Sequence, residues 1–260
     1  MRKIAIYDSF TEPKHRRLID ETAARAGFTV DYYAAPAAVP ADKRGDYEVI
    51  YGMPKPGELK DFVNLKWFCG SFAGVDAYLD DSLYPSPEVM LSNSSGAYGV
   101  TIAEHVVMVT LMLLRRMPEY IEIVRNHGWS NQLAVRSIRD NEFTILGTGN
   151  IGVNVAERLR GMGAARILGL SRSGKPHPAF DQVRPISDLD TVLPQTRILI
   201  MGLPSTPETF HILNRERIAL LPADAYVINV GRGTAIEQKP LIEALNLSLI
   251  HISEPTRRSY

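Results

Sequence analysis

The run Gly147-Thr148-Gly149-Asn150-Ile151-Gly152 constrains the fold more than any other feature of this 260-residue chain. It follows the apolar residues 143–146 and precedes the amphipathic stretch 153–160, so we expect a strand, a tight turn and a helix in that order. In such a turn the first glycine permits the bend, the second opens the backbone to a pyrophosphate, and the third lets the helix pack close to the strand. The N–H groups at the start of the helix would then hold the phosphates. The sequence therefore predicts a dinucleotide site formed by Gly147, Thr148, Gly149, Asn150, Ile151 and Gly152.

The bulk composition is that of an ordinary globular protein. Hydrophobic residues make up 45% and charged residues 22%, and the formal net charge is zero, which gives no electrostatic reason to expect nucleic acid or an anionic membrane as a partner. The single Cys69 cannot form an internal disulfide and suits a reducing compartment. The most apolar stretch, 106–114, is too short to cross a bilayer, and residues 1–7 are typical of a first strand and not of a signal peptide. We expect a cytoplasmic protein without a metal site.

Strands and helices alternate along the chain in two blocks. Short apolar strands separated by helical stretches predict a parallel sheet covered by helices in the first block, and the same rhythm returns from Glu142 onward. Between them, the helix expected over Thr101–Arg116 is apolar on nearly every face, so it should be buried on all sides. It could lie at a seam between domains, at a subunit interface, or in the core of one domain.

Four motifs in order resemble one family. Gly70–Asp76, Ala103–His105, Gly147–Gly152 and Asn229–Gly233 together resemble the D-isomer-specific 2-hydroxyacid dehydrogenases, of the phosphoglycerate dehydrogenase and glyoxylate/hydroxypyruvate reductase kind, as far as about Asn246. The resemblance implies an α/β fold with a flavodoxin-like substrate domain at 1–96 and a Rossmann NAD(P)-binding domain at 97–246. It also implies a homodimer and an NAD(P)-dependent oxidoreductase that reduces a small 2-keto acid to a D-2-hydroxy acid.

The resemblance assigns the substrate-binding groups. Arg232 would be the catalytic residue that holds the substrate carboxylate and polarises its carbonyl, since a guanidinium stays charged and bonds two oxygens at once. The alternative is a surface arginine in a glycine-rich turn. Phe72, Ala73 and Gly74 would donate backbone N–H groups to the carboxylate, with Phe72 as a modest apolar wall, although an ordinary turn explains the same residues.

The resemblance also assigns further cofactor contacts. Leu203, Pro204 and Thr209 would belong to a loop along the cofactor, and Val230 and Gly231 would contact the cofactor from a separate turn. A plain surface turn would explain the two prolines of the first loop equally well. Thr101 matches the position beside the nicotinamide, but an N-cap for the long helix is the simpler role.

The residues after the second strand indicate which nicotinamide binds. An acidic residue there would bond the ribose 2′-OH and repel a 2′-phosphate. This chain has Ser171, Arg172, Ser173 and Lys175 instead, two hydroxyls and two cations that suit a phosphate dianion. The sequence therefore predicts that NADP(H) is preferred and NAD(H) possible. The alternative is that both cations are solvated loop charges and either cofactor binds.

The C-terminal part departs from the family. The expected acid–base pair, a histidine oriented by a glutamate, should follow Arg232, and no histidine of this chain matches that position. Residues 247–257 resemble the translation of a sequencing-library adapter, so we expect a truncated Rossmann domain without its sixth strand and a non-native tail at 247–260. The alternative is that Leu247–Ile252 forms a short strand. This form should then be inactive. A non-catalytic dinucleotide-binding sensor or corepressor-like module is the alternative function, which the presence of Arg232 disfavours.

Overall fold

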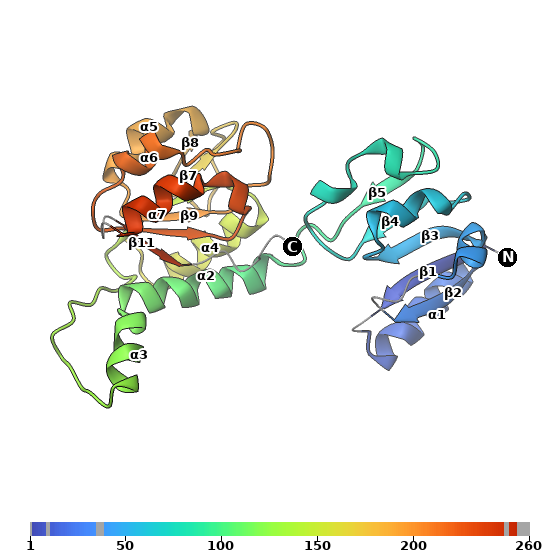
Figure 1. Cartoon of the computed structure of the whole chain (residues 1–260), viewed down its shortest axis with the longest axis horizontal. Helices are drawn as coiled ribbons and strands as arrows, with labels where there is room; N and C mark the ends of the chain where they lie inside the picture. Colours follow the sequence, from blue (N-terminus) through green and yellow to red (C-terminus); the bar gives the residue numbers. More distant parts are fainter. Residues whose placement is uncertain (1, 9–10, 35–38, 247–249, 254–260) are drawn as a thin grey trace. The chain divides into compact units, whose positions relative to one another are not determined.

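The structure is a computed structural model that describes residues 2–8, 11–34, 39–246 and 250–253. The chain divides into two compact units, Met1–Ala97 and Tyr98–Tyr260, and each is built on its own parallel sheet (Figure 1). The predicted α/β class is confirmed.

The first unit holds a five-stranded sheet in the order β2-β1-β3-β4-β5, with every neighbouring pair parallel. This is the order of flavodoxin-like folds. The strands are β1 (Arg2–Asp8), β2 (Phe28–Ala34), β3 (Tyr47–Gly52), β4 (Trp67–Gly70) and β5 (Met90–Ser92).

Helices cover this sheet less than the sequence predicts. The described residues of the unit form one α-helix, α1 (Pro13–Arg25). The other connections contain 3-10 turns: η1 (Ala41–Asp46), η2 (Pro56–Asp61), η3 (Asp76–Tyr78) and η4 (Asp81–Leu83). Prolines at 54, 56, 85 and 87 interrupt the later connections and remove backbone donors that a longer helix needs. Aromatic rings fill the core instead, with Tyr47, Phe62 and Phe68 fully buried.

The second unit holds a six-stranded sheet in the order β11-β10-β9-β6-β7-β8, again with parallel neighbours. This is the Rossmann order, and the chain reverses direction across the sheet between β6 and β9, where open α/β folds bind ligands. The strands are β6 (Glu142–Leu146), β7 (Arg166–Ser171), β8 (Gln182–Pro185), β9 (Ile198–Met201), β10 (Ala225–Asn229) and β11 (Ile250–Ser253). The helices and 3-10 turns are α2 (Gly99–Leu114), α3 (Met117–Arg125), α4 (Asn150–Gly161), η5 (Ile186–Asp188), α5 (Leu189–Val192), η6 (Leu193–Gln195), α6 (Arg215–Leu220), η7 (Gly233–Ala235) and α7 (Gln238–Asn246).

The expectation of a Rossmann sheet without its sixth strand is wrong. Strand β11 pairs in parallel with β10, with Ala225 opposite Ile250 and Ile228 opposite Ser253, and so occupies the edge position. Isoleucine favours an extended backbone, and two of the four residues of β11 are isoleucines, Ile250 and Ile252. The rest of the predicted tail, 247–249 and 254–260, lies outside the described residues, so its non-native origin stays a prediction.

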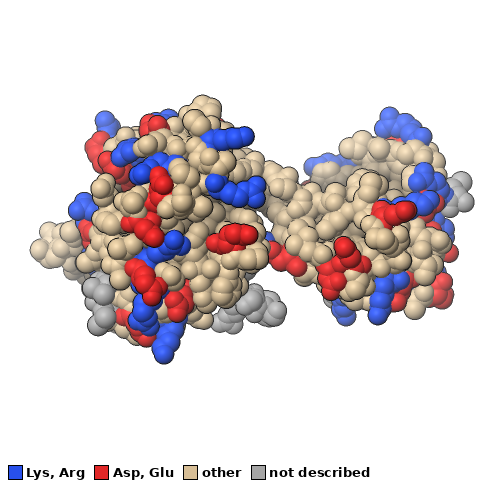
Figure 2. Space-filling model, turned by 90° about the horizontal axis from the view of Figure 1, so that it is seen from above, with Lys and Arg blue, Asp and Glu red and all other residues tan. Residues whose placement is uncertain are grey.

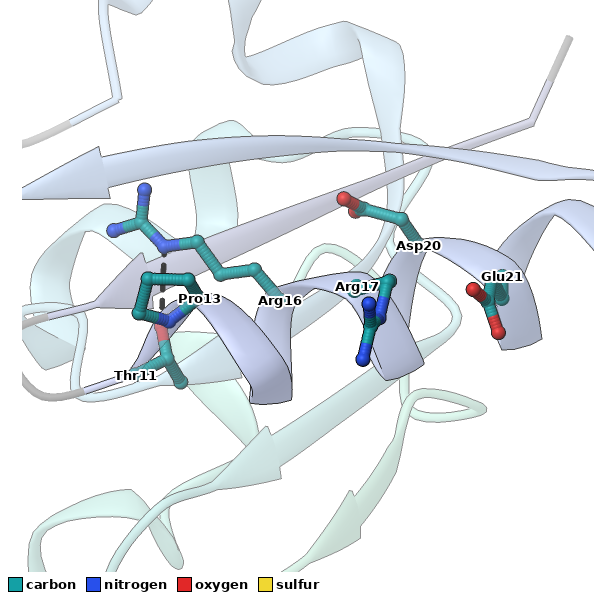
Figure 3. A pocket seen from close by; sticks show the side chains of 6 residues that line it. All are labelled: Thr11, Pro13, Arg16, Arg17, Asp20 and Glu21. Carbon is teal, nitrogen blue, oxygen red and sulfur yellow. Dashed lines mark hydrogen bonds between the residues drawn. The ribbon is translucent and has the colours of Figure 1, made fainter.

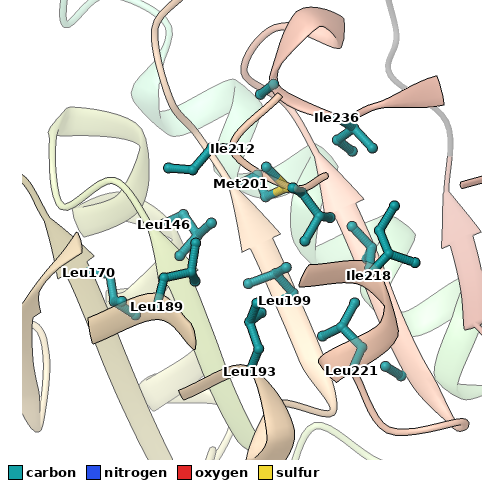
Figure 4. Packing of buried hydrophobic residues seen from close by; sticks show 14 of the residues in the cluster. Leu146, Leu170, Leu189, Leu193, Leu199, Met201, Ile212, Ile218, Leu221 and Ile236 are labelled. Carbon is teal, nitrogen blue, oxygen red and sulfur yellow. The ribbon is translucent and has the colours of Figure 1, made fainter. Parts of the chain in front are cut away.

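The central strands of this sheet are buried on both faces, as their continuous apolar runs predict. One face carries the cluster drawn in Figure 4, where Leu146, Leu170 and Leu199 of the strands meet Leu189 and Ile218 of the covering helices. The opposite face packs against α2 and α4.

Helix α2 is not buried on all sides within this chain. Ala103, Val106 and Leu114 face the core, whereas Met108 and Val100 are 48% and 49% exposed. One side of the helix thus packs in the core of the second unit, and the other side carries exposed apolar side chains. In the part of the chain that the structure describes, no helix is long and apolar enough to cross a membrane.

Candidate dinucleotide site

The turn after β6 has the geometry that the glycine pattern predicts. Gly147 has a φ of +100°, which only glycine adopts without strain. A Cβ placed on Gly152 would clash with the carbonyl oxygen of Gly147, so only glycine lets α4 begin this close to the strand end. A Cβ on Gly149 would meet nothing within 4 Å. The backbone there faces open space, which fits the approach of a pyrophosphate.

Helix α4 begins at Asn150 with Gly149 as its N-cap, and no side chain caps it. Its first N–H groups therefore remain for an anion, with the positive end of the helix dipole behind them. Gly99 at the start of α2 adds a constraint that the sequence did not reveal. A Cβ there would clash with the side chain of Asn150, so the two helix starts lie against each other.

The loop after β7 is a compact turn with Arg172 and Lys175 on its exposed side. Ser171 Oγ accepts from the amide of Gly174 at 3.1 Å, and Ser173 Oγ accepts from the amide of Lys175 at 3.4 Å. The two serines thus shape the loop, and their hydroxyl protons can still be donated to a ligand. Residues 172–175, which form the turn itself, include no carboxylate.

The electrostatics of Glu208 connect the loop after β9 with the basic loop. A hydrogen bond from Thr206 holds the pKa of the Glu208 carboxyl below its ordinary value, and the positive charge of Arg172 acts in the same direction. The charge of Arg172 thus acts on the loop after β9, which sequence spacing alone does not indicate.

The loops after β9 and β10 lie against each other. A Cβ on Gly231 would lie 2.5 Å from the carbonyl oxygen of Leu203, so a side chain at 231 has no room. Ser205 Oγ lies 3.3 Å from the hydroxyl of Thr234 and joins the same two loops. Thr209 Oγ1 donates to the carbonyl of Pro204 at 2.7 Å, so both residues hold the shape of the first loop.

Arg232 stands half-buried in the turn that ends β10, beside Val230 and Gly231. The buried Asn229 fixes this turn. Its Oδ1 accepts from the amide of Gly231 at 3.0 Å, and its Nδ2 donates to the carbonyl of Arg232 at 2.9 Å. Asn229 is the first residue of the Asn229–Gly233 motif, and the sequence alone does not indicate that it holds the turn in place. The second unit thus gathers at one edge of its sheet the glycine turn, the basic loop, the loop after β9 and Arg232.

The predicted carboxylate loop lies in the first unit. Phe72 is 7% exposed and stacks on Tyr78 with ring centroids 4.9 Å apart, so its ring belongs to the core and is not an apolar wall for a substrate. The carbonyl of Phe72 accepts from Ser94 at 3.0 Å, and that of Ala73 accepts from Asn93 Nδ2 at 2.6 Å. The amides of Phe72, Ala73 and Gly74 have no hydrogen-bond acceptor among the described residues.

Thr101 is not an N-cap. The cap position of α2 is Tyr98, and Thr101 sits one turn inside the helix, where its hydroxyl donates to the carbonyl of Tyr98 at 3.2 Å. The helix starts two residues earlier than predicted because Gly99 packs on α4.

Five histidines have described side chains, and none of them lies within ion-pair distance of a carboxylate of the described residues: His15, His105, His127, His177 and His211. His211, which follows the loop after β9, stacks on Phe210 with centroids 3.9 Å apart. Across the same segments, no group of three metal-ligating side chains is present.

Other surface features are less specific. A hollow of about 510 Å³ runs along α1 (Figure 3), but Arg16 and Arg17 are balanced there by Asp20 and Glu21, and the Arg16 guanidinium lies over the Tyr32 ring at 4.7 Å. On the face shown in Figure 2, acidic and basic side chains are interspersed.

The comparisons with known proteins identify the second unit. Residues 107–252 match the family model described as D-isomer specific 2-hydroxyacid dehydrogenase, NAD binding domain. A glyoxylate/hydroxypyruvate reductase of Arabidopsis thaliana is 32% identical over 176 residues, which cover 66% of this chain and 53% of that protein. The chain spans about half the length of the curated relatives it matches.

Solved structures extend the likeness over the whole chain. A D-isomer specific 2-hydroxyacid dehydrogenase family protein of Aeromonas salmonicida superposes with a TM-score of 0.83 at 27% identity, covering 99% of this chain and 83% of its own. A D-isomer specific 2-hydroxyacid dehydrogenase of Xanthobacter autotrophicus in complex with NADPH gives a TM-score of 0.78 at 25% identity, covering 100% and 84%.

The contact at Gly152 gives a direct test. We expect Gly152→Ala to lower the free energy of unfolding by about 2 kcal/mol or more and to abolish dinucleotide binding, because the methyl group forces α4 away from β6. The matched control is Gly161→Ala in the same helix, where a Cβ meets nothing within 4 Å and stability should hold or rise by up to about 1 kcal/mol. Chemical denaturation measures both. Equal stability of the two variants would contradict the close-packing argument.

Proposed function

Because this chain belongs to the D-isomer specific 2-hydroxyacid dehydrogenases, we propose that it forms the dinucleotide-binding and carboxylate-binding part of an NADPH-dependent reductase of small 2-keto acids. The observation that carries the proposal is the shared edge of the second sheet, where the uncapped start of α4 and Arg232 both follow parallel strands. The name of the Arabidopsis relative supports glyoxylate or hydroxypyruvate as the substrate class.

Each unit offers its own donors for this chemistry. Arg232 would hold the substrate carboxylate and polarise the 2-keto oxygen, since its fork bonds two oxygens and keeps its charge. In the first unit, the amides of Phe72, Ala73 and Gly74 are available as further donors to a carboxylate. A bound nicotinamide would supply the hydride. Asn229 would keep the Arg232 turn in place through its two backbone hydrogen bonds.

Among the side chains that the structure describes, no oriented histidine is available to donate the proton. A general acid contributes about 10² to 10⁴ in rate, and no described histidine is paired with a carboxylate that could orient it. We therefore propose that this 260-residue chain binds its ligands without turning them over efficiently.

The activity test follows from that missing donor. The 260-residue chain should reduce glyoxylate or hydroxypyruvate with NADPH at least about 100-fold more slowly than the roughly 10 s⁻¹ of an ordinary enzyme. The decrease of NADPH absorbance measures the rate, and NADPH fluorescence on binding is the control that the protein is folded. Turnover at an ordinary rate would contradict the proposal.

We further propose that NADP(H) is the preferred cofactor. Arg172 and Lys175 are exposed just after the end of β7, and residues 172–175 include no carboxylate. A 2′-phosphate bound beside this turn would receive the charge of both side chains.

The cofactor preference is measured by titrating NADPH and NADH into the native chain and into Arg172→Asp. We expect the substitution to weaken NADPH binding by about tenfold or more while NADH binding changes little, since only NADPH carries the 2′-phosphate. Arg139→Asp, at a side chain 78% exposed in the same unit, is the matched charge control and should change neither affinity. Equal affinity of the native chain for the two cofactors would remove the proposal.

Exposed apolar side chains on α2 and α3, called the apolar strip below, support a homodimer. Met108 and Met112 of α2 are 48% and 37% exposed, and Ile121 and Val124 of α3 are 37% and 68% exposed. The two helices contact each other, and exposed apolar side chains on adjoining elements are typical of an interface. We propose that a second copy of the chain covers it.

A charge placed in the strip tests the dimer. Met108→Lys combined with Val124→Lys should convert a dimer to a monomer in sedimentation equilibrium, because two charges would be desolvated at the interface. Val63→Lys, at a side chain 68% exposed in the first unit, is the control and should leave the dimer intact. A monomeric native chain would refute the proposal.

A further inference from the structure

A pocket of about 240 Å³ lies at the amino end of the strands of the second unit, away from the glycine turn and Arg232 of the same unit. Three arginines line it. Arg166 is the first residue of β7, Arg184 belongs to β8, and Arg197 directly precedes β9. The glycine turn follows the carboxyl end of β6, so the two sites are separated by the length of that strand, about 13 Å.

The floor of the pocket is held in place by buried hydroxyls. Thr196 is 3% exposed and donates to the carbonyl of Val192 at 3.0 Å, while Thr144 of β6 is 6% exposed with its hydroxyl 3.0 Å from that of Thr196. These hydrogen bonds fasten the segment between α5 and β9 to the sheet, so the shape exists without a ligand.

The arginines are only partly neutralised. Arg166 donates to a neutral amide, Gln182 Oε1, at 2.9 Å. Arg197 Nε lies 3.6 Å from Asp224 Oδ2, and that oxygen already receives a 2.6 Å hydrogen bond from Arg136.

Arg184 is the best-paired of the three, with Nε and Nη2 both on one oxygen of Asp188 at 2.9 and 2.8 Å. Of the residues that line the pocket, Glu142 is the one carboxylate. Gln195 also lines it, and its side-chain amide makes no hydrogen bond with the described residues. The local excess of charge is positive, and donor groups remain unused.

We propose that this pocket binds a phosphate monoester as a second ligand site, separate from the dinucleotide site. The three guanidinium groups come from three separate chain segments, and such a set of donors suits the several oxygens of a tetrahedral group. A phosphate monoester carries nearly two negative charges at pH 7. The volume exceeds that of the phosphate group alone and leaves room for an organic part beside Leu168.

The test is calorimetric titration of glycerol 3-phosphate into the full chain at low salt, with succinate and sulfate as comparison ligands. We expect saturable binding at one site with a Kd on the order of 1 mM or lower, and about tenfold weaker binding in Arg166→Gln/Arg197→Gln. Both side chains are exposed and neither substitution breaks the Arg136–Asp224 pair, so this variant should fold.

Two control variants show whether the phosphate binds in the pocket itself. Arg125→Gln/Arg139→Gln removes the same charge from side chains 70% and 78% exposed elsewhere in the unit and should bind as the native chain does. Arg172→Gln alters the basic loop after β7 and should also leave this binding unchanged. Loss of binding in either control would overturn the proposal, in the second case because the phosphate then sits at the dinucleotide site.

The comparison ligands complete the test. Tighter binding of succinate would overturn the phosphate assignment, equal weak binding of sulfate would mean an adventitious ion only, and absence of any binding would refute the site. Should the double variant fail to fold, amide chemical shifts of the native chain decide. The proposal requires that Arg166, Thr191 and Gln195 respond to glycerol 3-phosphate, and unchanged shifts at these residues would overturn it.

Discussion

The contact between the first turn of α4 and the end of β6 is the constraint on which the rest of this structure depends. Only glycine at 152 allows the helix to start against the carbonyl of Gly147, and this fixes where the helix N-terminus points. The backbone of the same turn is tied to its neighbours, with the amide of Gly147 bonded to Leu170 and that of Gly202 bonded to Leu146. The ends of three adjacent strands therefore meet in one place.

Parallel strands give such a sheet two chemically different edges. At the carboxyl edge lie the backbone donors of the glycine turn, the basic loop after β7 and Arg232. These are the groups that a dinucleotide and a small carboxylate need. At the amino edge, Arg166 and Arg197 surround a pocket whose floor is fixed by buried threonines. A continuous apolar core that includes Leu146, Leu170 and Leu199 lies between the two edges and holds the strands that carry them together.

Most of the fold follows from the sequence because its signals are local. The apolar runs, the glycine turn and the β7 loop each depend on neighbouring residues, and the order of both sheets agrees with the predicted α/β class. The failures concern longer-range effects. Phe72 turns into the core because Gly70 leaves space for its ring, Thr101 loses the cap position because Gly99 packs on α4, and β11 completes a sheet that the sequence alone suggested was unfinished. That the charge of Arg172 acts on Glu208 is likewise evident only from the folded chain.

The dinucleotide site is tested most directly by an amide chemical-shift titration of the native chain with NADP⁺. We predict saturable shifts at Gly149, Asn150 and Ile151, where the α4 N-terminus would meet the pyrophosphate, together with shifts at Arg172. Saturable binding that leaves those residues unchanged, or no binding at all, would contradict the claim that the glycine turn is the dinucleotide site.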